Sequence, residues 1–310
     1  MSQREKALER KITREYQRAY NEIEQKAEAY FKKFDAKDKE QKLLLSQGQI
    51  TRKDYLEWRK TWLQRTKEYN AMLNDCSEIL TNASVISAAY VRGESIEMYA
   101  TGANWAAYDV CKELNLNLDF TIYDKKAVVK MLKDNPQLLP DMSEQAKKKI
   151  PKSMRWNKGH IQSEIMQGII QGKSALDVAK GLVKAVNMDK NASVRNARTA
   201  LCSARSAGTN DRYKEARDDY GVDIKKQWLA TLDGKTRHEH RELDGQIKDL
   251  DEPFIVDGEE IQYPADPTAE PRLIYNCRCT LTNVIGKYNN NANYDFMGDV
   301  SYSQWVKGGR

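Results

Sequence analysis

The sequence predicts a mainly α-helical protein, in which an elongated helical N-terminal region precedes a small α+β C-terminal module. Apolar residues recur at three- or four-residue spacing through most of residues 1–221, which is the period of an amphipathic helix. From residue 222 to residue 286 that periodicity fades, while Gly, Pro, Asp and Asn become frequent. We therefore expect a helical region over 1–221, a module over 222–286 and a polar, Asn-rich tail over 287–310. The helical region could also be divided into two parts near residues 115–157.

The composition narrows the class of protein. With 31% charged residues and a mean hydropathy of -0.79, the chain suits long, partly exposed helices better than one dense core. The net charge of +6 permits contact with DNA or with an acidic protein surface without requiring either. No apolar run approaches the roughly 20 residues of a membrane span, and the N-terminus lacks the apolar core of a secretory signal. We expect no membrane contact, a cytosolic site of synthesis and reduced cysteines.

Helical periodicity predicts several separate helices, over about residues 2–34, 51–76, 84–114, 158–171, 174–186 and 192–220. A charged linker would join the first two, and short helices and turns would fill residues 117–150. Thr51 and Asp54 have the spacing of a capping box at the start of the second helix. Gly221 is placed to end the last helix as its C-terminal cap.

The C-terminal module contains three short runs that favour β-strands: Phe254–Val256, Ile261–Tyr263 and Thr280–Ile285. Turn-forming residues separate these runs, so the module is expected to consist of hairpins and loops. The tail after residue 286 is expected to dock through Tyr302 and Trp305, the large aromatic residues near its end.

The densest basic run of the chain surrounds Trp156. It comprises Lys147, Lys148, Lys149, Lys152, Arg155 and Lys158. Such a run can face phosphate groups of DNA or an acidic partner protein. A solvated loop is the more common meaning of a charge run, so both interpretations remain open and the loop is favoured.

The segment from residue 228 to residue 279 carries the chemistry of the module, because two of the three histidines and two of the five cysteines fall within it. His238, His240, Cys277 and Cys279 offer a nitrogen and sulfur set suited to zinc. Structural zinc sites usually space paired cysteines by two residues, whereas each pair here is separated by one. The spacing therefore favours a cluster without a metal over a zinc site.

A metal-free cluster would be held by charge-assisted hydrogen bonds among Asp233, Arg237, Asp244 and Arg278. A catalytic interpretation is also open. The pair His238 and His240, flanked by Asp233 and Asp244, could hold a metal for phosphodiester hydrolysis. Nothing else in the sequence supplies the remainder of such a site, so this interpretation is the least favoured.

The same segment resembles a known family. Its pattern is Trp-x4-Asp-x2-Thr-Arg-x2-His-x2-Leu-Asp-Gly-Gln from Trp228 to Gln246, then Pro-x-Asp-Pro, then Asn-Cys-Arg-Cys ending at Cys279. This series resembles the C-terminal module of Mu F-like minor head proteins, also called phage head morphogenesis proteins. The residues that we expect to hold the module together, without catalysis, are Trp228, Asp233, Arg237, His240, Asp244, Gly245, Asn276, Cys277, Arg278 and Cys279.

The resemblance implies a virion protein of a tailed bacteriophage, present in a few copies inside the capsid near the portal vertex. It implies assembly in the host cytoplasm, with the portal protein as partner, the major capsid and scaffolding proteins as further partners, and non-specific contact with packaged or ejected DNA. Two rival functions stay open. One is a metal-dependent nuclease or other enzyme of the packaging apparatus, and the other is a dedicated DNA-binding protein.

Two departures from the family pattern bear on cofactors and activity. Some members have Cys-x2-Cys in place of residues 237–240 and a histidine shortly before Cys-Arg-Cys, which resembles a zinc site. This chain has Arg237 at the first of those positions and no histidine between Pro264 and Asn276, so no cofactor is expected and zinc remains the alternative. In related toxins the module precedes an enzymatic domain, whereas here only the tail follows, so no toxin domain is expected.

Overall fold

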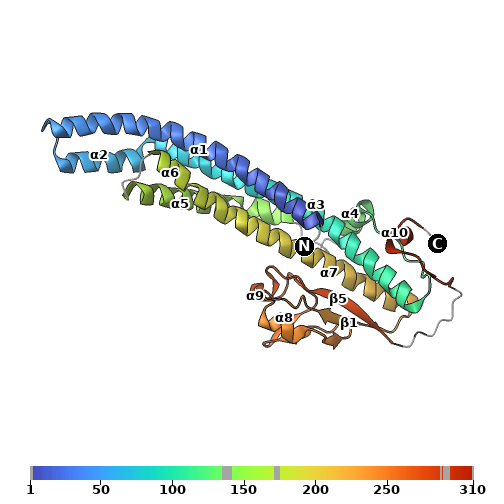
Figure 1. The fold of residues 1–310 in the computed structure, drawn as a ribbon. Helices are drawn as coiled ribbons and strands as arrows, with labels where there is room; N and C mark the ends of the chain where they lie inside the picture. Colours follow the sequence, from blue (N-terminus) through green and yellow to red (C-terminus); the bar gives the residue numbers. More distant parts are fainter. Residues whose placement is uncertain (1–2, 135–141, 171–174, 287, 289–293, 309–310) are drawn as a thin grey trace. The chain divides into compact units, whose positions relative to one another are not determined.

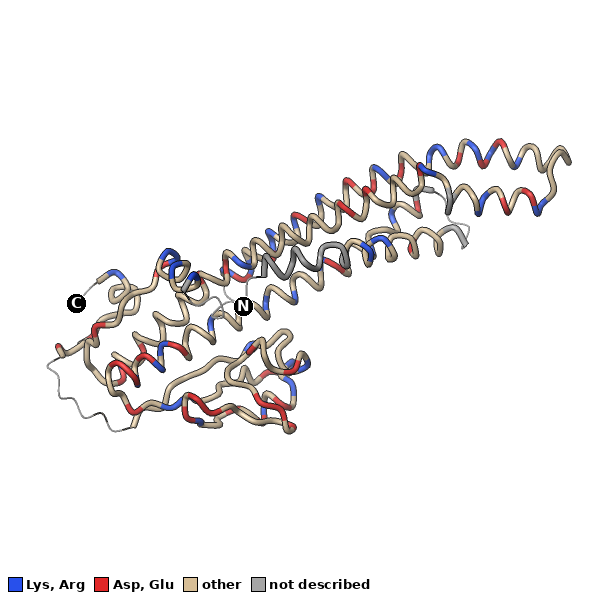
Figure 2. Tube along the Cα trace, turned by 180° about the vertical axis from the view of Figure 1, so that it is seen from behind, with Lys and Arg blue, Asp and Glu red and all other residues tan. Residues whose placement is uncertain are grey.

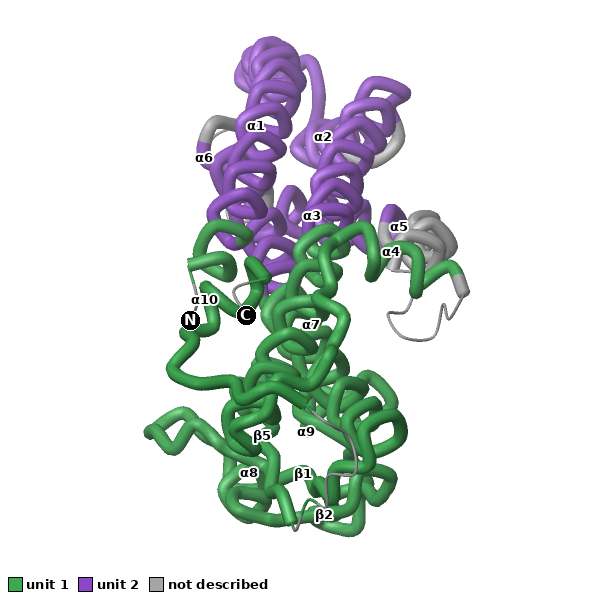
Figure 3. Tube along the Cα trace, turned by 90° about the vertical axis from the view of Figure 1, so that its right-hand side faces the viewer, with its two compact units in different colours: residues 1–8, 91–141, 195–310 green, residues 9–90, 142–194 purple. Residues whose placement is uncertain are grey.

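The computed structural model describes residues 3–134, 142–170, 175–286, 288 and 294–308, with the backbone alone for 63–65, 134, 142–153, 169–170 and 175–176. It confirms a mainly α-helical protein with a long helical N-terminal region and a small sheet-containing C-terminal part (Figure 1). Two compact units are formed (Figure 3). The first unit comprises residues 1–8, 91–141 and 195–310, and the second comprises residues 9–90 and 142–194.

The second unit is a helical bundle. It is built from α2 (Arg52–Arg65), α5 (Met142–Ile170), α6 (Ala175–Gly181) and parts of α1 (Gln3–Ser46), α3 (Lys67–Leu114) and α7 (Val183–Tyr220). Tyr16 of α1 shares a 2.7 Å hydrogen bond with Ser193 of α7, and Asn157 of α5 donates to the Thr81 hydroxyl of α3 at 3.0 Å. None of the described helices is both long and apolar enough to cross a membrane.

The first unit is organised by a close crossing of α3 and α7. Gly102 of α3 and Gly208 of α7 let the two backbones approach directly, because a Cβ at Gly102 would overlap the Arg205 carbonyl oxygen and one at Gly208 would overlap that of Tyr99. The short helix α4 (Lys125–Asp134) belongs to the same unit.

A three-stranded antiparallel sheet follows α7 in the first unit. Its order is β2 (Ile247–Lys248), β1 (Ile224–Leu229), β5 (Thr280–Ile285), with Trp228 opposite Leu281. A separate hairpin pairs β3 (Phe254–Val256) with β4 (Glu259–Ile261), and α8 (His238–Leu243) and α9 (Pro271–Ile274) complete the module. The hairpin turn uses Asp257 and Gly258, whose φ values of 54° and 78° are those of a tight two-residue turn.

The tail docks through Tyr302 and Trp305, as expected, and the element that it contacts is α3. The short helix α10 (Tyr302–Trp305) stacks Tyr302 on Trp105 with ring centroids 4.0 Å apart, and it places Trp305 edge-on to Tyr108. The Tyr108 hydroxyl also donates to the Val300 carbonyl at 3.0 Å. Aromatic contacts therefore fix the described end of the tail.

Several predicted helix boundaries were wrong. In most of these cases a helix was predicted to end or to start at a position where the structure has a continuous helix. The predicted linker at 35–46 is helical, where Asp38 is buried and accepts a 2.9 Å hydrogen bond from the Tyr55 hydroxyl. The basic run predicted as a loop lies on α5, and α3 and α7 begin earlier than expected. The predicted caps hold: the Thr51 box is formed, and Gly221 ends α7 at a φ of 67°.

The crossing of α3 and α7 generates a stability prediction. We expect Gly102→Ala to lower the free energy of unfolding by about 1–3 kcal/mol or more, because the added methyl group meets rigid backbone. Gly93→Ala on the same helix is the matched control, since nothing lies within 4 Å of its added Cβ. That variant should gain up to about 1 kcal/mol from helix propensity. Urea unfolding followed by circular dichroism measures both, and equal effects at the two sites would contradict the close crossing.

Candidate functional site: a buried thiol and imidazole cluster

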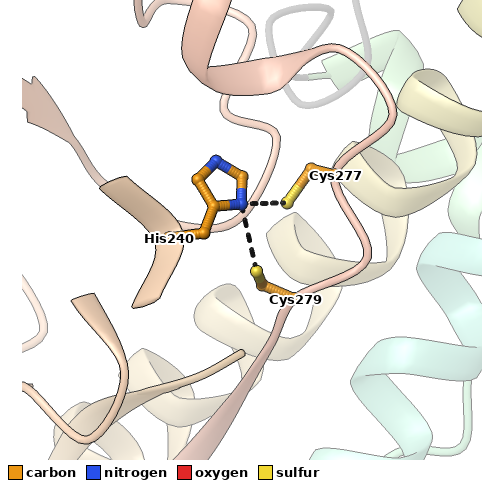
Figure 4. A group of neighbouring side chains, drawn as sticks. All are labelled: His240, Cys277 and Cys279. Atoms are coloured by element: carbon orange, nitrogen blue, oxygen red, sulfur yellow. Dashed lines mark hydrogen bonds between the residues drawn. The ribbon is translucent and has the colours of Figure 1, made fainter. Parts of the chain in front are cut away.

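The candidate site is formed by His240, Cys277 and Cys279, named here the thiol–imidazole cluster. One donor atom from each residue lies within 4.8 Å of the others, and all three residues are buried (Figure 4). The cluster lies beside Trp228 of β1, whose fully buried ring meets the His240 ring edge-on at 5.8 Å between centroids. The strand β1 therefore supplies the wall against which the histidine packs.

The orientation of His240 is set by α8 and by a backbone carbonyl. Its Nε2 lies 2.7 Å from the Leu273 carbonyl oxygen, which can only accept a hydrogen bond. This contact assigns the proton to Nε2, so the Nδ1 lone pair faces the two thiols. Nδ1 is 3.8 Å from Cys277 Sγ and 3.2 Å from Cys279 Sγ (Figure 4).

The two cysteines reach the same side of the chain because the segment before β5 alternates. Cys277 and Cys279 are buried, and Arg278 between them is exposed, as expected for extended backbone in which residues two apart share a face. The outward Arg278 forms a bidentate pair with Asp233, at 2.5 and 2.6 Å. The Asp233 pKa is held below its usual range, first by this hydrogen bond.

A third cysteine adjoins the cluster from α7. The Cys202 thiol donates to the Cys279 carbonyl oxygen at 3.6 Å and contacts the Cys277 thiol. That contact is the first cause of a raised pKa for Cys277, while the Cys277 thiol and burial raise the pKa of Cys279. In the absence of a cation, these two cysteines are therefore protonated thiols rather than reactive thiolates.

The remaining predicted residues support neighbouring loops. Asp244 accepts a 2.8 Å hydrogen bond from the Ala230 amide, and Gly245 adopts a φ of 78° and donates to the Trp228 carbonyl at 2.9 Å. Arg237 reaches the Leu273 carbonyl at 3.4 Å. Asn276, at a φ of 56°, donates its amide to the Thr199 hydroxyl at 3.1 Å.

Two expected groupings are not observed. His238 does not join the cluster, because its side chain is 81% exposed and lies 3.0 Å from Glu242. Among Asp233, Arg237, Asp244 and Arg278, only Asp233 and Arg278 pair with each other; Arg237 and Asp244 bind backbone atoms instead. The acids that the nuclease interpretation would use therefore point to an arginine and an amide rather than to the cluster.

The basic run is only partly described. The side chains of Lys147, Lys148, Lys149 and Lys152 lie outside the described residues. Arg155 is exposed, and Lys158 donates to the Asn74 side chain of α3 at 2.9 Å. Figure 2 shows basic and acidic positions interspersed along the described helices.

Sequence reasoning missed Cys202, Thr199 and Lys226. The first two lie on a helix that is separated in sequence from the module, so no local spacing signals their contact. Lys226 lies on the buried face of β1, where its ammonium donates to the Leu250 and Gln262 carbonyls at 3.1 and 3.0 Å. Burial lowers the Lys226 pKa to about 8. A lysine in a strand is usually exposed, so nothing local in the sequence indicated that Lys226 is buried.

Comparison with known proteins identifies similar sequences over the second half of the chain. Residues 159–282 match the family described as Phage Mu protein F like protein. The minor head protein GP7 of Bacillus phage SPP1 is 30% identical over 126 residues, covering 41% of this chain and 40% of that protein. A protein of Enterococcus faecalis named NAD(+)--arginine ADP-ribosyltransferase EFV is 31% identical over 151 residues, covering 47% of this chain and 31% of its own length.

A third relative, an uncharacterized protein of Haemophilus influenzae, is 31% identical over 120 residues, covering 38% of this chain and 23% of that protein. The chain thus spans between 23% and 40% of the length of these curated relatives. No solved structure matches it.

The Asp244 contact generates a prediction for the module. We expect Asp244→Ala to lower the free energy of unfolding by about 1–3 kcal/mol, because the amide of the buried residue Ala230 loses its acceptor. Asp244→Asn keeps a carbonyl oxygen at this position and is the matched control. Limited proteolysis with mass spectrometry should show faster cleavage within residues 222–286 for the alanine variant only. Equal cleavage of both variants would mean that the acceptor is dispensable.

Proposed function

Through residues 159–282 the chain belongs to the Mu F-like family of phage head proteins, and from this premise we propose that it acts in procapsid assembly by binding the portal vertex. The observation that supports this most is the ordered motif from Trp228 to Cys279 lying inside the matched region, together with similarity to a phage minor head protein. The proposed location is the capsid interior beside the portal, reached from the host cytoplasm during assembly.

The proposed role is a binding role without catalysis. The thiol–imidazole cluster is buried, and Asp233 and Asp244 are engaged elsewhere, so a substrate would find neither a nucleophile nor a general base exposed there. The relative named as an ADP-ribosyltransferase is aligned over only 31% of its length, and its name describes the whole of that protein rather than the aligned part. Long helices with mixed charge offer contact area for the portal, the major capsid protein or the scaffolding protein.

A secondary contact with DNA is proposed for the basic run of residues 147–158. The mild net charge of +6 favours conditional, sequence-independent binding over a dedicated DNA-binding function. Contact with packaged or ejected DNA would then depend on the high local concentration of DNA inside the head.

Portal binding predicts a specific complex. Co-expression of this chain with its cognate portal protein should yield a complex that survives size-exclusion chromatography, whereas co-expression with the major capsid protein alone should not. Adding the capsid and scaffolding proteins should yield procapsids that contain the chain. Cryo-electron microscopy with symmetry relaxed at one vertex would locate it. Procapsids that lack the portal but still contain the chain would contradict the proposal.

DNA contact predicts a salt dependence. Binding to a duplex of arbitrary sequence should weaken steeply as salt rises, and substituting Gln for Lys147, Lys148 and Lys149 together should lower the log–log salt slope by up to about 3, since each phosphate contact contributes about 0.9. The matched control replaces Lys6, Lys11 and Lys26, three of the eight lysines of α1, a helix that lies outside the run. Equal slopes for the two triple variants, measured by fluorescence anisotropy, would exclude the run as the contact.

A further inference from the structure

The thiol–imidazole cluster contains three donors, and a fourth lies against it on another element. We propose that Cys202, His240, Cys277 and Cys279 bind one Zn²⁺, which joins α7 to the loop before β5. The site is structural, since four protein ligands leave no open position for substrate. This inference concerns metal binding within the first unit and goes beyond the proposed portal function.

The spacing of the donors fits tetrahedral zinc. Zinc–sulfur bonds of about 2.3 Å and zinc–nitrogen bonds of about 2.0 Å place tetrahedral ligand atoms roughly 3.5–3.8 Å apart. The His240 Nδ1 lies 3.8 and 3.2 Å from the two sulfurs, and the three donor atoms fall within 4.8 Å of one another. The two nitrogen–sulfur distances are therefore within about 0.3 Å of those that one tetrahedral zinc ion requires.

The histidine is already held in the form that binds a metal. A ligating histidine usually donates its other ring nitrogen to a carbonyl or carboxylate, which fixes the tautomer. His240 does so at 2.7 Å to the Leu273 carbonyl, leaving the Nδ1 lone pair directed at the sulfurs. A purely structural buried histidine does not need its second nitrogen aimed at two thiols, because a thiol is a weak hydrogen-bond partner.

An independent set of contacts shows why Cys202 is the fourth ligand. Arg195, Thr199 and Cys202 are four and three residues apart on α7 and so share one helix face. Each meets the same loop: Arg195 lies over the Tyr275 ring at 4.7 Å, Thr199 accepts from the Asn276 amide, and Cys202 donates to the Cys279 carbonyl. The Cys202 thiol also contacts the Cys277 thiol, but its sulfur is not one of the three donors that lie within 4.8 Å of one another, so ligation requires its side chain to turn toward them.

The charge of the proposed site and the softness of its sulfur ligands favour zinc as the bound ion. Metal binding would release the thiol protons, and three thiolates with Zn²⁺ carry a net charge of -1. Arg237, whose guanidinium lies 3.3 Å from His240 Nε2, is placed to compensate that charge. Three sulfurs and one nitrogen without a carboxylate favour zinc over magnesium, calcium or manganese, which prefer oxygen ligands.

The test measures metal content and ligand number in the full chain. Protein purified under reducing conditions from zinc-supplemented cells should contain one zinc per chain by elemental analysis. After replacement by Co²⁺, the visible absorption should be that of a tetrahedral site, and the thiolate-to-cobalt charge-transfer band should have the intensity of three thiolates. Cys202→Ser should lose about one third of that band and weaken zinc binding at least about 100-fold, the upper loss seen for mere supporting residues.

Two further variants keep the result interpretable. Cys111→Ser removes a buried thiol of the same unit that donates to the Leu118 carbonyl, and it should keep full zinc and the full cobalt spectrum. Cys202→His restores a ligand at the same position and should retain one zinc with a two-thiolate spectrum. It therefore distinguishes a ligand from a residue needed only for folding.

Three outcomes would overturn the site. These are wild-type protein that takes up no zinc on titration, a Cys202→Ser variant with unchanged cobalt spectrum and affinity, or a disulfide joining Cys202 to Cys277 in protein purified under reducing conditions. None of these measurements involves the portal, so failure of the zinc site and failure of the proposed function are distinguishable.

Discussion

The pairing of β1 with β5 is the constraint on which the C-terminal module depends. It brings Trp228 opposite Leu281 and Leu229 opposite Thr280, closing about fifty intervening residues into one loop-rich unit. Closing a long loop costs entropy only slowly with length, but the closed loops must then be held by specific contacts. Part of this holding comes from an apolar core that includes Trp228, Phe254 and Leu273. The rest comes from directional hydrogen bonds, in which the Asp244 carboxylate accepts from an amide, His240 lies on a carbonyl and Lys226 donates to two carbonyls. Because β5 begins one residue after Cys279, the register of this pairing also fixes where both cluster cysteines lie.

Much of the fold class follows from periodicity, whereas boundaries depend on tertiary contacts. The strands at 254–256 and 280–285 were predicted because their alternation is local, and the cap at Gly221 because its chemistry is local. The segment 35–46 was wrongly predicted as a linker, because its charged residues looked solvated. Asp38 is in fact buried, and Lys42 and Arg59 lie 2.8 and 3.4 Å from its carboxylate, contacts that only the packed bundle supplies. The strand β1 escaped prediction for a related reason, since Lys226 interrupts its apolar face.

Two pairs of residues at the candidate site have the same spacing in sequence but different geometry in the structure. His238 and His240 are two residues apart on a helix, which turns them about 200° from each other, so only one faces the module interior. Cys277 and Cys279 are also two apart, but on extended backbone, which turns them to the same face. The one-residue spacing that argued against a zinc site in sequence is therefore suitable for the cysteines and unsuitable for the histidines. Local secondary structure, which the motif alone does not reveal, decides between them.

The position of Arg237 links the family pattern to the proposed metal site. At the position where the family resemblance implies a cysteine, this chain has Arg237, a cation that contacts the Leu273 carbonyl and His240. A guanidinium cannot ligate zinc, so a complete set must take its fourth ligand from elsewhere, and Cys202 is the thiol that meets the cluster. Taking a ligand from α7 changes what the site does, because the metal then bridges a long helix and the module rather than two loops of the module. Folding of the loop before β5 would become coupled to its contact with α7, and the Arg195 and Thr199 contacts to Tyr275 and Asn276 would form together with the metal site.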